Sequence, residues 1–189
     1  MMKLVFAFLF LTTYIYAEEI PVDSEAITKA HNVLRAKYKS PPLKYSTSLE
    51  KAARRWAEKL QHDGCKMVHS HGKVGKTGEN LYWASARIMT RTDGNGNKTQ
   101  SRSLQKVKER EVVQAWYDEV KWYDYKTNSC EEGQMCGHYT QLIWNTTSEV
   151  GCAAMACADR SQVWVCEYTE PGNISIRYPD GKVEKLRPY

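Results

Sequence analysis

The sequence lacks a strong excess of charge of either sign, and beyond its first residues it lacks long apolar runs. Its 189 residues carry a formal net charge of +5, with acidic and basic residues interspersed. This balance gives no support for nucleic acid as a partner. After the run Leu4–Leu11 no apolar segment is long enough to cross a bilayer, so we expect no transmembrane segment. The length suits a single domain with its own core, and we find no internal repeat.

Motifs of common hydrolytic and metal-binding classes are also missing. No Cys-x-x-Cys pair, no Gly-x-Ser-x-Gly elbow and no His-Glu-x-x-His pattern occurs. Ser70 does lie beside His69, and a metal with a glutamate could activate water, so a serine- or metal-dependent hydrolase is one hypothesis. Sequence neighbours do not make a catalytic triad, because an oriented base must reach the hydroxyl. The absence of a recognisable nucleophile favours a binding protein over an enzyme.

The N-terminus has the pattern of a secretory signal peptide. Lys3 precedes the apolar run, and Ala17 stands before Glu18 at a plausible cleavage point. A membrane anchor is the alternative, but the run is too short to span a bilayer. We therefore predict a signal peptide at residues 1–17, a single domain at 18–189 and an extracellular location.

The cysteines and the sequons agree with secretion. All the cysteines follow the signal segment, and an even number in a secreted chain predicts disulfides, although spacing alone does not choose the pairing. The six are Cys65, Cys130, Cys136, Cys152, Cys157 and Cys166. The possible glycosylation sites are Asn97, Asn145 and Asn173.

Apolar periodicity predicts three helices. Asp23 or Ser24 can cap a first helix that continues to about Tyr38, before Pro41-Pro42. A capping box at Thr47–Glu50 predicts the start of a second helix, which Asp63-Gly64 ends. A third helix is predicted over roughly 104–121.

The strand signals come mostly from the second half of the chain. Ala153–Cys157 and Val163–Thr169 alternate as strands, and a short strand is possible around 174–177. The stretch Gly137–Trp144 has the aromatic and β-branched residues of a buried, partly extended segment. Together these elements predict a mixed α+β sandwich with helices on the faces of a sheet.

Residues 90–103 form a polar insert for which we predict a mobile surface loop with a glycan at Asn97. Its Gly- and Asn-rich centre is turn material. Arg87, Arg91, Lys98 and Arg102 could form a weak patch for glycosaminoglycans, but composition favours a solvated loop.

Motifs spread along nearly the whole chain resemble those of the CAP superfamily, which comprises cysteine-rich secretory, antigen 5 and pathogenesis-related-1 proteins. Within it, the chain is most similar to venom-allergen-like proteins of parasitic worms. The matching segments are His31-Asn32 with Arg35, Cys65 to His69-Ser70, Gly78–Leu81, Trp116-Tyr117 with Glu119, Gly137–Trp144, and Cys166–Tyr168 with Pro171–Asn173. The resemblance implies a three-layer α-β-α sandwich. It also implies the disulfides Cys65–Cys157, Cys130–Cys136 and Cys152–Cys166.

The resemblance further implies a cleft formed by His69, Glu79, Glu119 and His138. Two imidazoles can bind zinc, or alternatively magnesium, while the carboxylates orient them or complete the coordination shell. His71 is a rival for His69, and no organic cofactor is expected.

The resemblance also implies lipid ligands. Sterol would bind at the aromatic loop formed by Trp122, Tyr123 and Tyr125 and running to Asn128, and fatty acid would bind in a channel between helices. The position where the family pattern has a further aromatic residue is Cys130 here, so the match is partial. The alternative is that these aromatics only cover the edge of the core. A secreted protein that interacts with a host or other extracellular protein is a further hypothesis, compatible with lipid binding.

Overall fold

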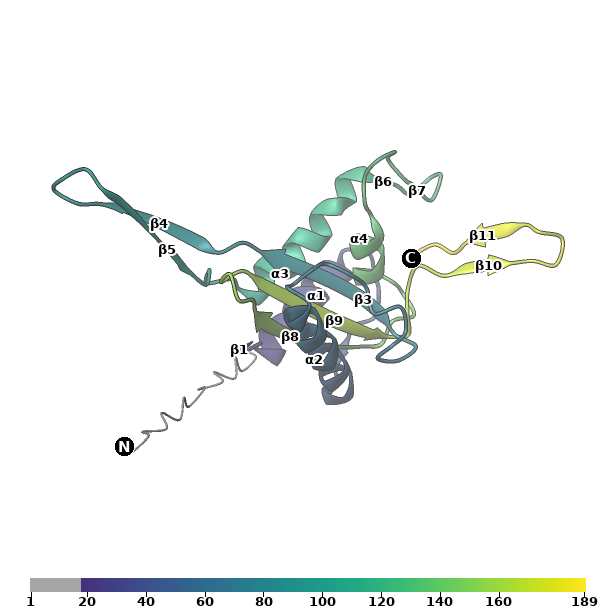
Figure 1. Cartoon of the computed structure of the whole chain (residues 1–189). Coiled ribbons are helices and arrows are strands. Elements are labelled where there is room, and N and C mark those ends of the chain that lie inside the picture. Colours follow the sequence, from purple (N-terminus) through teal and green to yellow (C-terminus); the bar gives the residue numbers. More distant parts are fainter. Residues whose placement is uncertain (1–17) are drawn as a thin grey trace, which may run out of the picture.

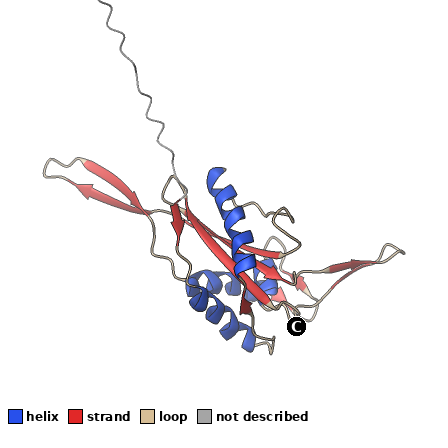
Figure 2. Ribbon diagram, turned by 90° about the horizontal axis from the view of Figure 1, so that it is seen from below, coloured by secondary structure: helices blue, strands red, loops and turns tan. Residues whose placement is uncertain are grey.

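A five-stranded sheet forms the middle of three layers (Figures 1 and 2). The computed structural model describes residues 18–189, so the predicted signal peptide lies outside the described residues. Strands run in the order β1, β8, β9, β3, and β2 pairs in parallel with β8. Their bounds are β1 Glu18–Ile20, β2 Lys44–Tyr45, β3 Gly78–Ala84, β8 Glu149–Ala156 and β9 Gln162–Thr169. β3 is therefore an edge strand of this sheet.

Helices cover both faces of the sheet, which confirms the α-β-α sandwich. Helix α2 packs on one face, and the other face carries α1, α3 and α4. A 3-10 turn, η1, follows α3 directly. The bounds are α1 Ser24–Ala36, α2 Thr47–His62, α3 Glu109–Tyr117, η1 Asp118–Trp122 and α4 Gly137–Leu142.

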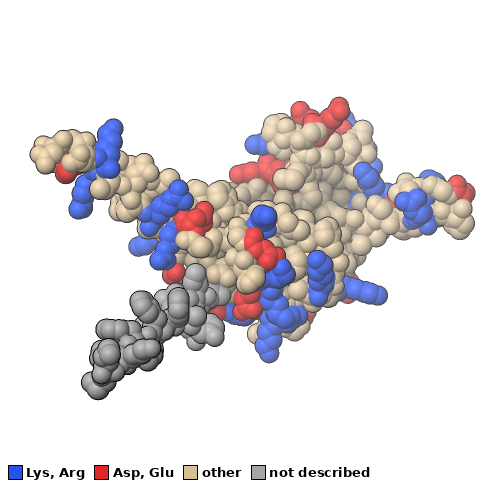
Figure 3. Space-filling view, viewed as in Figure 1, with Lys and Arg blue, Asp and Glu red and all other residues tan. Residues whose placement is uncertain are grey.

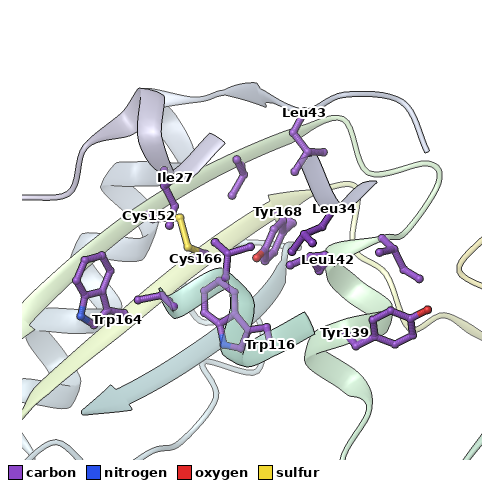
Figure 4. Close-up of a cluster of buried hydrophobic side chains, with 14 of the residues drawn as sticks. Ile27, Leu34, Leu43, Trp116, Tyr139, Leu142, Cys152, Trp164, Cys166 and Tyr168 are labelled. Atoms are coloured by element: carbon purple, nitrogen blue, oxygen red, sulfur yellow. A yellow bond between two sulfur atoms is a disulfide. The ribbon is translucent and has the colours of Figure 1, made fainter. Parts of the chain in front are cut away.

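The two central strands supply a separate core to each helical layer. Because successive side chains point to opposite faces, Cys152 and Ala154 join the α1/α3/α4 core while Ala153 and Met155 join the α2 core. Both strands are buried nearly throughout. Figure 4 shows the larger core, with Trp116, Trp164 and Tyr168 packed beside the Cys152–Cys166 disulfide.

The three disulfides have the pairing implied by the family resemblance. Cys152–Cys166 joins β8 to β9, Cys65–Cys157 joins the segment after α2 to the end of β8, and Cys130–Cys136 closes a local loop. Within residues 18–189, no helix combines the length and apolar character needed to span a membrane.

The first two helices begin close to their predicted positions. The Asp23 carboxylate accepts hydrogen bonds from the main-chain N–H groups of Glu25 and Ala26, both at 2.9 Å, and so caps α1. Helix α2 begins at Thr47, but the predicted capping box is wrong. The Glu50 side chain bonds to Arg54 and Tyr45 instead of turning back to the helix start.

The third helix was predicted too long at its N-terminal end. It begins at Glu109 instead of near residue 104, because the Glu111 carboxylate accepts the N–H of Lys108 and fixes the start there. The strand prediction at 153–157 was too short, since β8 already begins at Glu149.

The extended conformation predicted for Gly137–Trp144 is wrong, because residues 137–142 form α4. The Glu119 carboxylate accepts the main-chain N–H groups of His138 and Tyr139, at 3.0 and 3.2 Å. These donors belong to the first turn, where a helix has unpaired N–H groups. A carboxylate distant in sequence therefore stabilises a helix that local propensity alone would not favour.

The loop predicted at 90–103 is also wrong, because this region forms an antiparallel hairpin of β4 (Arg87–Thr92) and β5 (Lys98–Ser103). Asp93 organises its turn by accepting the N–H groups of Asn95 and Asn97. A second hairpin, β10 (Ser175–Arg177) with β11 (Val183–Lys185), includes the predicted short strand. The two hairpins project on opposite sides of the body (Figure 1).

Arg35 and His31 on α1 are completely buried and connect this helix to the rest of the fold. The Arg35 guanidinium donates to the main-chain carbonyls of Leu142, Trp144 and Thr147, each at 2.9 Å. These bonds hold the C-terminal end of α4 and the segment after it, and thereby help to position His138.

Candidate functional site

His138 lies in the first turn of α4 and is oriented by Glu119 of η1. Its Nδ1 atom is 2.6 Å from Oε1 of Glu119, whose other oxygen caps the helix. Because a carboxylate accepts, Nδ1 carries the hydrogen and Nε2 remains available. Glu119 thus caps the start of α4 and also holds the imidazole ring of His138 in one orientation.

His69 and Glu79 form a second pair of the same kind. Glu79 is the second residue of β3, and its Oε1 atom is 2.5 Å from Nδ1 of His69. The main-chain N–H of Ser70 donates to the same oxygen at 3.0 Å. Burial alone would raise the pKa of Glu79, but its hydrogen bonds with His69, Glu167 and Ser70 outweigh burial and lower that pKa. The Glu79 carboxylate is therefore charged at neutral pH.

The two pairs meet at one cleft along edge strand β3. The imidazole centroids of His69 and His138 are 6.3 Å apart, and Trp116 stacks against His138. The cleft has a volume of about 460 Å³, and apolar side chains form most of its wall. Its lining comprises Met67, His69, Leu81, Tyr82, Trp83, Ala115, Trp116, Glu119, Met135 and His138. His71, the rival of His69, is exposed and does not line it.

Glu167 lies behind Glu79 and was not identified as a site residue from the sequence. It faces Glu79 across the β3–β9 pair and is fully buried. Burial, and then the neighbouring Glu79 carboxylate, raise the pKa of Glu167 to about 8. A neutral Glu167 explains how two carboxyl groups can be adjacent in the interior. No motif spacing predicts this pair, because it depends on strand register.

Ser70 does not have the environment of a catalytic serine. It is buried, and its hydroxyl interacts with Glu79. Among the described residues no hydrogen bond joins Ser70 to an imidazole. The geometry of a base-activated nucleophile is therefore missing at this residue.

The family model of the cysteine-rich secretory protein family (CAP) matches residues 28–168, which includes all four cleft residues. This chain belongs to the CAP family. Among curated relatives, the pathogenesis-related protein PRMS of Zea mays is 35% identical over 165 residues, covering 87% of this chain and 84% of the relative.

Solved structures share the CAP fold at lower sequence identity. Venom allergen-like protein 4 of Schistosoma mansoni has a TM-score of 0.54 and 23% identity, over 77% of this chain and 86% of that chain. The structure of NaASP2 with Zn²⁺ has a TM-score of 0.58 and 22% identity, over 81% and 83% of the respective chains. These likenesses confirm the predicted fold.

In this CAP chain the predicted sterol loop is a small hairpin of β6 (Tyr123–Asp124) and β7 (Ser129–Cys130). The Tyr123 hydroxyl donates to Asn128 at 2.7 Å, and its ring packs on Tyr139 of the core. Trp122 ends η1 and lies under the Lys121 ammonium group. Tyr125 is the most exposed of these rings, at 42%.

Residues 185–189, here called the C-terminal tail, cover the exposed side of this loop. The Tyr189 ring stacks on Tyr125 with centroids 4.6 Å apart, and the Arg187 guanidinium lies 4.9 Å from the centre of the Tyr125 ring. Asn128 donates to the Lys185 carbonyl at 2.7 Å. The predicted sterol loop thus packs in part against the protein's own chain, which sequence reasoning did not anticipate.

A groove between α1 and α3 is the second candidate lipid site of this CAP domain. Its volume is about 420 Å³, and alanine, valine and leucine side chains form most of its surface. Cationic groups lie among its lining residues, which are Ala26, Lys29, Ala30, Val33, Leu34, Lys37, Arg110, Val113 and Gln114. An apolar channel with a cationic rim can receive a chain that ends in a carboxylate.

The three sequons differ in their surroundings. Asn97 is exposed near the tip of the β4–β5 hairpin. Asn145 is exposed, but its sequon residue Thr147 is buried and donates to the Glu170 carbonyl. The Asn173 amide donates to the Gly137 carbonyl at 2.9 Å, so a glycan there would have to be accommodated beside α4.

Proposed function

We propose that this CAP protein is secreted and binds lipids, with a fatty acid in the α1–α3 groove. The observation that carries the proposal is the groove itself, which is lined by the apolar residues Ala30, Val33 and Leu34 together with the cations Lys37 and Arg110. Its volume of about 420 Å³ lies within the range of small-ligand pockets, roughly 300–1,000 Å³. Burial of methylene groups would stabilise the complex by about 0.8 kcal/mol each.

A fatty-acid test must distinguish binding in the groove from non-specific hydrophobic binding elsewhere on the protein. Mass spectrometry of lipids that co-purify with the secreted protein would identify the natural ligand class. Ala30→Trp should fill the groove and weaken binding of a fluorescent fatty acid at least tenfold. Ala36→Trp places the same ring at an exposed position of α1 outside the groove and should leave the affinity unchanged. Equal affinity of both variants would rule out the groove as the site.

Sterol binding at the aromatic loop is the second part of the proposal. The Tyr125 ring presents flat aromatic surface, and a sterol that packs on it would compete with Tyr189 and Arg187, which already contact this ring. Changing Tyr123 and Tyr125 to Ala should weaken sterol binding while the fold survives. Because Tyr123 also packs on Tyr139, thermal unfolding of this variant must be measured beside the binding.

The cleft residues fit a loosely held divalent cation without a catalytic role. Metal-binding histidines commonly donate their second ring N–H to a carboxylate, as His69 and His138 do to Glu79 and Glu119. Across residues 18–189, no group of three or more His, Cys, Asp or Glu side chains converges to hold a metal ion. Two imidazoles would thus leave other positions to water or a ligand, and nitrogen donors suit zinc better than magnesium. When bound, the cation would supply positive charge to the cleft.

Calorimetry with zinc can test this assignment. The His69→Ala/His138→Ala variant should lose measurable binding. His62 is exposed at the end of α2 and does not line the cleft, so His62→Ala should bind as the wild type does. His71→Ala tests the rival histidine separately. Wild-type affinity in the double variant would exclude the cleft.

A further inference from the structure

The hairpin of residues 87–103, here called the arm, has a charge pattern that the lipid-binding proposal does not use. It carries Arg87, Arg91, Lys98 and Arg102 but only one carboxylate, that of Asp93. Every residue of the arm is exposed. Figure 3 shows Lys and Arg side chains spaced along it where it leaves the body.

The strand register fixes where these cations point. Arg87 pairs with Ser103 and Arg91 with Thr99, so both arginines lie on one face of the ribbon. Lys98 pairs with Thr92 and Arg102 with Ile88, which places them on the other face. Within each face the two cations are four residues apart, or about 14 Å along the strand. Two-stranded ribbons twist strongly, so a partner lying along the axis can reach cations from both faces.

The arm's charges are largely uncompensated within the fold. No ion pair of the described residues involves any of the four cations. The Asp93 carboxylate is engaged by the turn, where it accepts from Asn95 and from both the main chain and the side chain of Asn97. Arg102 lies near enough to Asp159 to contribute to lowering the pKa of that carboxyl, after the hydrogen bonds from Ser161. The outer pair, Arg91 and Lys98, forms no ion pair among the described residues, and the nearest charge of opposite sign on the arm is that of Asp93 at the turn.

From this geometry we infer that the arm is a binding surface for a sulfated polysaccharide. Guanidinium groups form paired hydrogen bonds with oxyanions, and the Thr, Ser and Gln side chains between the cations can bond to sugar hydroxyls. The arm contains no Phe, Trp or Tyr on which nucleic-acid bases could stack. Its exposed apolar residues Ile88 and Met89 lie near its base, and its tip is polar, so it is not shaped to insert into a membrane.

A heparin-derived octasaccharide is the probe, with binding measured by calorimetry at several salt concentrations. All proteins carry Thr99→Val, which removes the Asn97 sequon while keeping a β-branched residue in β5. We expect Arg91→Gln/Lys98→Gln to weaken binding at least tenfold and to reduce its salt dependence. The charge-retaining swap Arg91→Lys/Lys98→Arg should stay within about threefold of the parent.

The matched control removes the same charge from the other projecting hairpin. Arg177→Gln/Lys182→Gln replaces two cations of the hairpin at residues 175–185. In this hairpin Asp180 and Glu184 offset most of the basic charge. This control should bind within about twofold of the parent. Equal losses in both double variants would show a net-charge effect only, and unchanged binding in the arm variant would exclude the arm; either result overturns the inference. Stronger arm-dependent binding to phosphatidylserine vesicles or single-stranded DNA would overturn the choice of partner.

Discussion

Single buried polar residues determine how the cleft is held, and His31 shows the principle. Nδ1 of His31 faces the Ile27 carbonyl at 2.7 Å, so it carries the hydrogen, and Nε2 accepts from the Tyr168 hydroxyl at 2.9 Å. Tyr168 in turn receives a hydrogen bond from Asn80, whose amide also donates to the His138 carbonyl. A chain of bonds thus connects α1 to the main chain of the cleft histidine, and it requires His31 to be neutral.

His31 should make the free energy of unfolding depend on pH. Burial, together with the nearby Arg35 charge, lowers the pKa of His31 to about 4 against the pull of the Ile27 carbonyl. Its stabilising contribution is therefore present above the unfolded pKa of about 6.5 and is lost as pH falls toward 4. We expect the stability advantage of the wild type over His31→Gln to shrink by roughly 2 kcal/mol between pH 7 and pH 4.5. Urea unfolding at both values measures it, and parallel curves would contradict the expectation.

Residue types identified the cysteines, and family motifs identified the cleft histidines with the glutamates that orient them, but neither identified the buried residues that support the cleft. Glu167 becomes a neighbour of Glu79 only through the β3–β9 register, and Arg35 bonds to carbonyls more than 100 residues away. Such contacts have no local spacing rule, because they depend on the assembled layers. The candidate cleft could therefore be predicted through family motifs, whereas its supporting residues required the fold.

At the level of elements, local signals predicted α1 and the core strands well, and failed where a distant group decides the conformation. The arm is a local exception, because hydrogen bonds to Asp93 within its own turn close a hairpin where polar composition predicts a loop. The helix α4 depends on the Glu119 carboxylate, which is distant in sequence. The tail illustrates the same limit. Its contacts with the aromatic loop join residues about 60 apart, so the sequence could predict the loop but not its cover.

The C-terminal tail should compete with sterol at the aromatic loop. In an Arg187→Gln/Tyr189→Ala variant the Tyr125 ring loses its stacking partner and its cation, and we expect sterol affinity to rise about three- to tenfold. Tyr178→Ala, an aromatic truncation on the β10–β11 hairpin, is the control and should change nothing. A fall in affinity would mean instead that Tyr189 forms part of the sterol site. Fluorescence titration with a sterol analogue distinguishes these outcomes.

At the scale of the whole molecule, the disulfides close loops of very different length. Cys65–Cys157 spans 92 residues and ties the end of α2 to the sheet, whereas Cys130–Cys136 spans only 6. In the loop-closure description a longer closed loop stabilises the fold more, by about 4–5 kcal/mol for a span near 100 residues and about 2 kcal/mol for a short one. The two bonds should therefore differ in their effect on unfolding.

Replacing both members of each pair by Ser should expose this difference. We expect Cys65→Ser/Cys157→Ser to lower the free energy of unfolding by about 4 kcal/mol and Cys130→Ser/Cys136→Ser by about 2 kcal/mol. Guanidinium unfolding under non-reducing conditions provides the comparison. Equal losses would show that strain or residual structure outweighs loop length.

The two opposed hairpins also affect how the protein moves through solution. Hairpins that project from opposite sides of a small body increase its frictional coefficient without adding much mass (Figure 1). A gel-filtration column calibrated with near-spherical standards should therefore give an apparent mass above the true mass of the protein, even for a single chain. Light scattering or sedimentation equilibrium, which do not depend on shape, are the appropriate measures of its oligomeric state.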